Sequence, residues 1–298
     1  MSDVSFPEQP TPRPGSPTDE SADERASHGG PASLQDGLTR VPLLGLDMVS
    51  ADSLDPVVDL VLGGARVHTD KIAPVLLTPN VDIMVHLDDD RDSVEAGLFR
   101  RAQYCLPDGQ PLVLVSGLFG QSLGARLPGS GLFAELWPRM VTQQVPTVVV
   151  ASSQEIAARL EVEHPKSGFI VPPMFDADDA GAIDEIVSEL LEQARSVDPE
   201  IVLVGIGNPK DARIIDALLQ RWDDQAGDLP LCVGLGGSFA MYLGLKKRAP
   251  EWVQRLGMEW FYRFAQEPRR LFHRYFVRDM AFIPMVVREL ISTRRRKR

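Results

Sequence analysis

The chain has 298 residues, 44% of them hydrophobic, and a formal net charge of -11, so it is long enough to bury a full core in one large domain or two small ones. Its longest apolar runs fall far short of the roughly 20 residues that cross a bilayer, and no basic-then-apolar signal peptide opens it. These features argue against a membrane-spanning protein and predict a cytoplasmic one. Two cysteines and five histidines without ligand spacing indicate neither a disulfide framework nor a metal site.

Residues 1–40 form a segment of low hydrophobicity. They contain six prolines, many Ser, Asp and Glu, and hardly any large apolar side chain. Such a segment cannot bury enough surface to offset chain entropy, so we expect a disordered leader.

From Val41 to residue 247, short apolar runs alternate with stretches of helical spacing. The apolar runs predict buried strands at 75–80, 111–117, 146–152, 168–173, 200–207 and 229–237. Helical spacing occurs at 52–62, 93–102, 152–163, 178–194 and 210–222. Strands that alternate with helices in this way imply βαβ crossovers, so we predict an α/β domain over 41–247 with a mostly parallel sheet.

Ligands of such sheets bind beyond the carboxyl ends of the strands, so the residues that follow each apolar run are candidate site residues. These are Thr78 to Asn80, Gly117 to Gly120, Ser152 and Ser153, Gly205 to Lys210, and Gly234 to Ser238. The glycine-rich ends could hold a diphosphate with backbone N–H groups, and Lys210 would lie beside a helix N-terminus with Pro209 in its first turn. Tight strand-to-helix turns are the alternative, because VGIGNP lacks the third glycine of a dinucleotide fingerprint and the Lys-Ser/Thr of a P-loop.

Two acidic motifs have both a structural and a catalytic interpretation. Asp108, in CLPDGQPLV, is either a turn residue or a general base held at the mouth of the sheet. The run LDDDRDSVE at 87–95 is either a set of carboxylates for a divalent cation or a capping box of Asp92 and Glu95, and we favour the capping box.

The C-terminal region carries the opposite charge to the rest of the chain. Residues 246–298 hold 15 Lys and Arg against 5 Asp and Glu. From Pro268 a helical projection separates an apolar half (Leu271, Phe272, Tyr275, Phe276, Met280, Phe282 and Ile283) from a basic one (Arg270, Arg274 and Arg278). This pattern is typical of a basic amphipathic helix on an anionic membrane surface, and a helix docked on the domain is the alternative.

Three stretches together resemble the WecG/TagA/CpsF glycosyltransferase family. They are VGIGNPK at 204–210, VGLGGSF at 233–239 and RAPEWVQRLGMEWFYRFAQEPRRLFHRYF at 248–276. The resemblance covers about residues 41–283. It implies a Rossmann-like sheet with helices on both faces and a metal-independent, inverting transferase without a cofactor. Such an enzyme moves N-acetylmannosamine or a related sugar from UDP to a polyprenyl-diphosphate-linked sugar in bacterial polysaccharide or teichoic acid synthesis.

The resemblance also implies roles for individual residues. The catalytic candidates are Thr78, Asn80, the base candidate Asp108, and Arg126. The donor-binding candidates are Gly205, Gly207, Pro209, Lys210, Asp211, Gly236 and Gly237. Arg263, Arg269, Arg270 and Arg274 are expected to stabilise the diphosphate leaving group in place of a metal, because a guanidinium suits bidentate phosphate contact. Residues 248–298 would both dock the enzyme on the inner face of the plasma membrane and complete its site.

The chain departs from the family pattern at several of these positions. Asp211 and Ala212 replace Gln and Glu after GNPK, Gly131 stands where an Asp is expected, and Ala240 stands where an Asp follows GGSF. A carboxylate in place of an amide beside the expected sugar pocket would change its hydrogen-bond polarity. The donor sugar could therefore differ, or the chain could be a catalytically altered member that binds nucleotide sugars at the membrane.

A nucleotide-dependent oxidoreductase is a weaker alternative. Expected partners include the donor, the acceptor lipid and the membrane but no nucleic acid, and a homo-oligomer stays open.

Overall fold

The structure is a computed structural model that describes residues 37–64, 66–69, 71–222, 228–246 and 279–296. Most of the expected leader, and residues 248–278 of the basic C-terminal region, lie outside these ranges. Arg263, Arg269, Arg270 and Arg274 are therefore outside the described residues, and their expected role stays a prediction.

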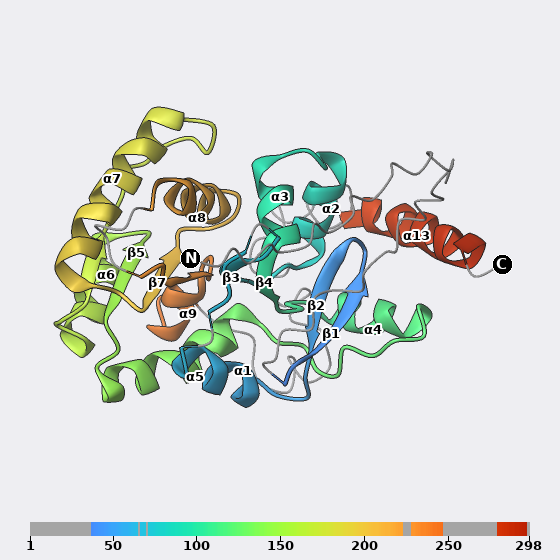
Figure 1. Ribbon diagram of the computed structural model, residues 1–298, viewed down its shortest axis with the longest axis horizontal. Helices are drawn as coiled ribbons and strands as arrows, with labels where there is room; N and C mark the ends of the chain where they lie inside the picture. Colours follow the sequence, from blue (N-terminus) through green and yellow to red (C-terminus); the bar gives the residue numbers. More distant parts are fainter. Residues whose placement is uncertain (1–36, 65, 70, 223–227, 247–278, 297–298) are drawn as a thin grey trace, which may run out of the picture. The chain divides into compact units, whose positions relative to one another are not determined.

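Within the described residues, eight strands form one mixed sheet (Figure 1). They are β1 (Thr39–Leu43), β2 (Leu46–Ser50), β3 (Ala73–Leu77), β4 (Ala102–Cys105), β5 (Thr147–Ala151), β6 (Gly168–Ile170), β7 (Ile201–Gly205) and β8 (Leu231–Gly234). Their order is β1-β2-β4-β3-β8-β7-β5-β6. The hairpin β1–β2 is antiparallel, and every other neighbouring pair is parallel. The predicted α/β fold with a mostly parallel sheet is confirmed.

Helices cover both faces of the sheet, as expected. One face packs against α2 (Val81–Asp89), α3 (Val94–Arg101), α7 (Ala180–Val197), α8 (Lys210–Arg221) and α13 (Phe282–Arg296). The other packs against α1 (Asp55–Leu62), α5 (Gly129–Gln143), α6 (Gln154–Glu163) and α9 (Ser238–Tyr242). The turn η3 (Asp279–Ala281) precedes α13, and α4 (Gln110–Leu118) follows β4.

The central strands are apolar on both sides because both sides are buried. In β5, Val148 and Val150 point into one core, and Val149 and Ala151 point into the other. A strand with two buried faces has no polar alternation to show. This explains why these strands were recognisable as continuous apolar runs.

The strand prediction at 111–117 is wrong, because this segment is the helix α4. Leu112 and Ser116 are buried four residues apart, whereas Leu114 and Leu118 are 67% and 62% exposed. A short apolar run does not distinguish a buried strand from a helix, and Pro111 lies in the first turn, where a helix tolerates it. The strands β1, β2 and β4 were not predicted, because exposed residues interrupt the buried ones in β1 and β2, and β4 contains Gln103, so none of them is a continuous apolar run.

The proposed capping box of Asp92 and Glu95 is also wrong. The N-cap of α3 is Ser93, whose Oγ accepts a hydrogen bond from Ala96 N–H at 3.2 Å. Glu95 is 1% exposed and forms an ion pair with Arg213 of α8.

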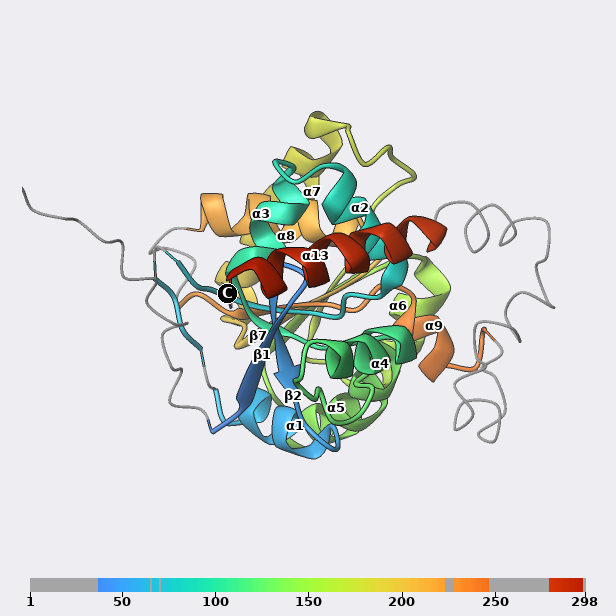
Figure 2. The same cartoon turned by 90° about the vertical axis from the view of Figure 1, so that its right-hand side faces the viewer.

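The helix α13 packs on the α/β core by one face (Figure 2). Phe282, Met285 and Val286 are 6–7% exposed in the core shared with α2, whereas Ile283 and Val287 are 55% and 48% exposed. Phe282 and Ile283 were expected on one apolar half. They lie on different faces because consecutive residues of a helix project about 100° apart. The domain boundary at 247/248 stays a prediction, but the end of the predicted appendage is part of the core.

Candidate functional site

The topology brings four strand ends together at one edge of the sheet. In the order β4-β3-β8-β7, the loops that follow these strands lie side by side. After β3 the chain enters α2, which packs in one core, and after β8 it enters α9, which packs in the other. Neighbouring strands that send their chains to opposite faces form a topological switch point, where ligands of open α/β sheets bind.

On one side of this switch point, three loops are joined around Asp108. Asp108 N–H donates to Pro79 C=O at 2.9 Å, and the Asp108 carboxylate accepts a long hydrogen bond of 3.4 Å from Gly129 N–H, at the start of α5. A Cβ on Gly129 would lie 2.9 Å from Thr78 Oγ1, so the glycine permits a close approach of α5 to the loop after β3. Asn80 caps α2 by accepting from Ile83 N–H at 3.1 Å. The structure thus brings Thr78, Asn80 and Asp108 together, and their catalytic roles stay predictions.

Arg126 belongs to the same edge of the sheet. Its two chain neighbours are fixed by backbone hydrogen bonds, from Ala125 N–H to Ala51 C=O at 2.8 Å and from Leu127 N–H to Pro107 C=O at 2.9 Å. These bonds hold the segment between the end of β2 and the loop that carries Asp108.

On the other side, the loops after β7 and β8 depend on glycine. Gly207 and Gly236 have positive φ angles of 108° and 53°, which non-glycine side chains rarely adopt. A Cβ on Gly205 would lie 2.2 Å from the Phe239 ring. The glycines serve tight strand-to-helix turns, which was the structural alternative of the sequence analysis.

Asp211 lies beneath these two loops and links them. Its carboxylate is 4% exposed and accepts hydrogen bonds from Ile206 N–H at 2.9 Å and Gly207 N–H at 2.8 Å through Oδ1, and from Gly236 N–H at 2.8 Å through Oδ2. Burial raises the pKa of this carboxyl to about 6, although the three N–H groups lower it. The expectation that Asp211 changes the polarity of a sugar pocket is not supported, because the side chain points inward.

Lys210 is directed toward a neighbouring loop. Its ammonium donates to Phe175 C=O at 2.5 Å and lies 4.4 Å from the centre of the Phe175 ring. This loop connects β6 with α7. The lysine therefore helps to fix this loop, and its predicted role in anion binding stays a prediction.

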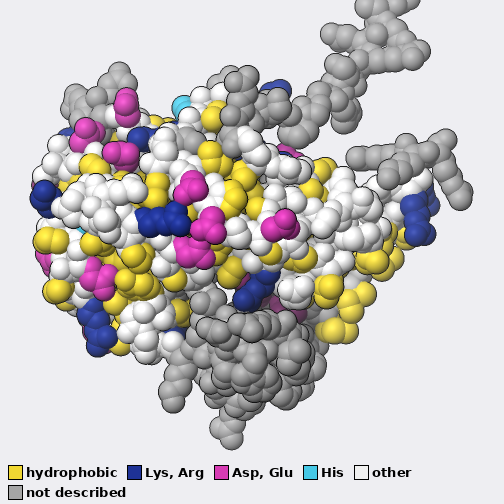
Figure 3. Space-filling model, turned by 90° about the horizontal axis from the view of Figure 1, so that it is seen from below, with side chains coloured by type: hydrophobic (Ala, Val, Ile, Leu, Met, Phe, Trp, Pro, Cys, Tyr) yellow, Lys and Arg dark blue, Asp and Glu magenta, His cyan; other side chains and the backbone are white. Residues whose placement is uncertain are grey.

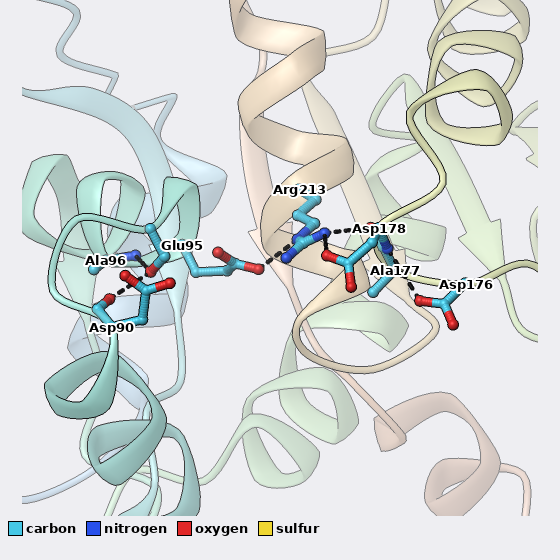
Figure 4. A network of polar contacts seen from close by, with 8 residues as sticks. Asp90, Glu95, Ala96, Asp176, Ala177, Asp178 and Arg213 are labelled. Atoms are coloured by element: carbon cyan, nitrogen blue, oxygen red, sulfur yellow. Dashed lines mark hydrogen bonds and ion pairs between the residues drawn. The ribbon is translucent and has the colours of Figure 1, made fainter.

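One turn further along α8, Arg213 fixes the same loop (Figure 4). Its guanidinium donates to Glu95 of α3 at 2.5 Å and to Ala177 C=O at 2.6 Å, and it also pairs with Asp178. Glu95 raises the pKa of Arg213 further above its usual value. Arg213 thus connects its own helix, α8, with α3 and with the β6–α7 loop. Its partner on α3, the Glu95 carboxylate, is 1% exposed.

The remaining departures from the family pattern occupy packed positions. A Cβ on Gly131 would lie 2.9 Å from Leu54 and 3.2 Å from Pro128, so an aspartate there would need the neighbours to move. Ala212 is fully buried in α8, and Ala240 is 7% exposed in α9. These residues act in packing between helices and sheet.

The described part of the chain holds no group of three or more His, Cys, Asp or Glu side chains placed to bind a metal ion. In the acidic run, Asp88 instead forms ion pairs with Arg91 and with Arg288 of α13. A cavity of about 240 Å³ lies beside these ion pairs, between the β1–β2 hairpin and α13, and none of the strand-end candidates lines it. No described helix combines the length and the apolar character needed to span a membrane.

Sequence reasoning missed the contacts of Asp211 and of Arg213. For Asp211 the local sequence offered one sign of a buried carboxylate. The residue lies four positions after Gly207, among the apolar residues at the start of a helix. Nothing local indicated Glu95, which is 118 residues from Arg213.

A Rossmann-like sheet with glycine loops at its switch point places the chain in the class of α/β proteins that bind ligands at this edge of the sheet. The chain belongs to the WecG/TagA/CpsF glycosyltransferase family, whose model matches residues 41–296. It is therefore a glycosyltransferase of the kind that acts in the synthesis of cell-surface polysaccharide.

Relatives in three bacteria carry the name N-acetylglucosaminyldiphosphoundecaprenol N-acetyl-beta-D-mannosaminyltransferase. The protein of Bacillus subtilis strain 168 is 27% identical over 207 residues, covering 67% of this chain and 74% of its own. That of Bacillus spizizenii strain W23 is 29% identical over 197 residues, covering 65% and 70%. That of Staphylococcus aureus strain MW2 is 26% identical over 236 residues, covering 78% and 87%.

Proposed function

We propose that the protein moves N-acetylmannosamine, or a related N-acetylated sugar, from its UDP derivative to a sugar on a polyprenyl diphosphate, with inversion at the anomeric carbon. The observation that carries this proposal is the convergence of Asp108 and the two glycine loops at the switch point between β3 and β8. The names of the three relatives support the choice of donor and acceptor.

In this proposal the two sides of the switch point have different tasks. The N–H groups of Ile206, Gly207 and Gly236 donate to Asp211, so other backbone N–H groups of the loops after β7 and β8 would receive the diphosphate of the donor. Asp108 would accept the proton of the acceptor hydroxyl as that oxygen attacks the anomeric carbon, and UDP would leave from the opposite face. The leaving diphosphate gains negative charge, which the arginines of residues 263–274 would stabilise without a metal.

The test is a transfer assay with UDP-N-acetylmannosamine and a short-chain prenyl diphosphate that carries N-acetylglucosamine. Wild-type protein should release UDP and form a disaccharide product of the expected mass. The variant Asp108→Asn should lose transfer by about a hundredfold or more and keep donor affinity, since a base acts on the acceptor.

The matched control is Asp92→Asn, an exposed aspartate in the turn between α2 and α3. Asp108→Asn activity equal to the control would refute the proposal, and loss of turnover on adding a chelator would refute the metal-free mechanism.

We further propose that the enzyme works at a membrane surface, where the acceptor lipid is held. The outward face of α13 presents Ile283, Val287 and Ile291, which are 48–55% exposed. The exposed Arg288 and Arg295 border this apolar stripe, which is the pattern of a helix that lies in the head-group region.

A second exposed apolar element begins next to Asp108. The helix α4 starts two residues after it and exposes Leu114 and Leu118. Helices α4 and α13 face the same side of the described structure (Figure 2). From below, apolar side chains gather at the right-hand end of the surface, the end at which α4 lies in Figure 1 (Figure 3). An apolar element beside the candidate base suits an acceptor whose sugar is tethered to the bilayer.

The membrane proposal is tested with vesicles that contain anionic phospholipid. The double variant Ile283→Ser/Val287→Ser should bind vesicles at least about tenfold more weakly, because it removes exposed apolar area and no buried contact. Its control is Val162→Ser, which changes an 84% exposed valine on α6. Equal vesicle affinity of the two variants would refute the assignment of this surface.

A further inference from the structure

The contacts of Asp211 join two loops that are 30 residues apart in the chain. Three backbone N–H groups converge on one carboxylate, two from the loop after β7 and one from the loop after β8. An ionised carboxylate can accept all three bonds at once, since each oxygen has two lone pairs and no proton. An amide in its place could accept through one oxygen only, and its NH₂ group would face the Gly236 N–H.

A second link between the ends of β7 and β8 is the hydrogen bond from Leu235 N–H to Val204 C=O at 2.8 Å, which lies before the two glycine turns and does not hold their N–H groups. The strands β7 and β8 contact Asp211 with apolar side chains and backbone, and a Cβ on Gly234 would lie 3.8 Å from that of Asp211. Gly207 and Gly236 have positive φ angles, which glycine reaches without strain and leaves as easily, so the hydrogen bonds to Asp211 help to fix where their N–H groups point.

We propose that Asp211 is a positioning residue: its ionised carboxylate holds the loops after β7 and β8 at the spacing at which they receive the donor diphosphate, and its protonation releases the loop after β8. The inference rests on the proposed function for the identity of the ligand. It adds to that function a pH dependence of donor binding that originates in a residue outside the pocket.

The other charged and titratable groups near this link have partners or surroundings of their own, and burial also raises the pKa of Asp216 on α8, which pairs with Arg101. Lys210 and Arg213 on α8 are bound to the β6–α7 loop. Cys232 in β8 has its pKa raised to about 12 by burial and stays neutral. The Lys246 ammonium, from the segment after α9, would lie 3.7 Å from a Cβ on Gly237 of the loop after β8.

The first measurement needs no ligand. The backbone amide signals of Ile206, Gly207 and Gly236 are followed by NMR between pH 4.5 and 8 in the full chain. They should titrate together with a midpoint near 6, the value to which burial raises the pKa of Asp211. Amide signals that do not move in this range would overturn the inference, whatever the protein binds.

The second measurement is the affinity for UDP-N-acetylmannosamine, whose diphosphate diester does not titrate in this range. Wild-type affinity should fall about tenfold between pH 7.5 and pH 5, because about one carboxylate in eleven stays ionised one unit below the midpoint. The variant Asp211→Asn should bind at least about tenfold more weakly at pH 7.5 and show no further loss at pH 5. The control is Asp216→Asn, a 5% exposed aspartate of the same helix that pairs with Arg101 instead.

The outcomes separate this inference from the proposed function. Titrating amides with a pH-independent donor affinity would overturn the positioning role and leave the proposed transfer intact. Absence of donor binding at every pH would refute the proposed donor, and with it the assignment of the two loops to a diphosphate. An Asp216→Asn variant with the same loss of affinity as Asp211→Asn would reduce the effect to a general loss of stability and overturn the inference.

Discussion

The ion pair of Arg213 and Glu95 gives the sharpest prediction about stability (Figure 4). The variant Arg213→Met removes the guanidinium and keeps most of the apolar stem. It leaves the Glu95 carboxylate, which is 1% exposed, without the cation that contacts it at 2.5 Å. It also removes the hydrogen bond to Ala177 C=O and the pair with Asp178.

The expected cost follows from the burial of the two partners. Removal of one member of a buried ion pair costs about 3–5 kcal/mol, chiefly because the other charge stays buried. The Arg213 side chain is 25% exposed, so water can reach part of the site. We therefore expect a loss near the lower limit, about 3 kcal/mol. The double variant Glu95→Gln/Arg213→Met should recover most of this loss, since it leaves no buried charge.

The assay is urea unfolding followed by fluorescence or circular dichroism, with the free energy taken at a common slope. The control is Arg139→Met, because Arg139 also contacts two carboxylates, those of Asp55 and Asp59, whose side chains are 64% and 70% exposed. Exposed pairs contribute about 0–1 kcal/mol, so this control should change stability little. A loss for Arg213→Met no larger than for Arg139→Met would refute the reasoning from burial, as would a double variant no more stable than the single one.

Three further predictions use the same kind of measurement. Because burial raises the pKa of Asp211 from 3.8 to about 6, its contribution to stability is fully present below 3.8 and is lost as the pH rises through 6. The unfolding free energy of wild type relative to Asp211→Asn should therefore fall by up to about 3 kcal/mol between pH 4 and 7, and a constant difference would contradict this. Gly205→Ala should cost more than about 2 kcal/mol in urea unfolding, because its Cβ would lie 2.2 Å from Phe239, and a neutral effect would show that the ring moves freely. In α13, Phe282→Ala should cost about 3 kcal/mol and Ile283→Ala less than about 0.5 kcal/mol, and similar losses would contradict the observed orientation of the helix.

Several features of this protein follow from its sequence alone. The β5 and β7 segments are continuous apolar runs because both faces of the sheet are covered, and such runs alternate with helical stretches in the order that a parallel sheet requires. The strand-end rule also placed Thr78, Asn80 and the glycine loops at one edge of the sheet, whereas Asp108 was expected in a turn before a strand at 111–117 that is in fact α4. The inferences that succeeded each depend on local spacing or on the direction of the strands.

Other features were decided by tertiary packing. An apolar run became α4 because one of its sides packs on the core while Leu114 and Leu118 stay exposed, and the run itself is equally consistent with a strand. Phe282 and Ile283 are adjacent in sequence, yet one is in the core and the other is exposed, because the neighbouring α2 covers only one face of α13.

The orientation of Asp211 has the same origin. Its sequence neighbours place it at the start of a helix beside glycines, which fits a residue that faces a ligand as well as one that faces inward. The loop after β8, 25 residues further along, supplies the Gly236 N–H that draws the carboxylate inward. A buried carboxylate is stable only where enough donors meet it, and the fold of the whole chain determines where those donors lie.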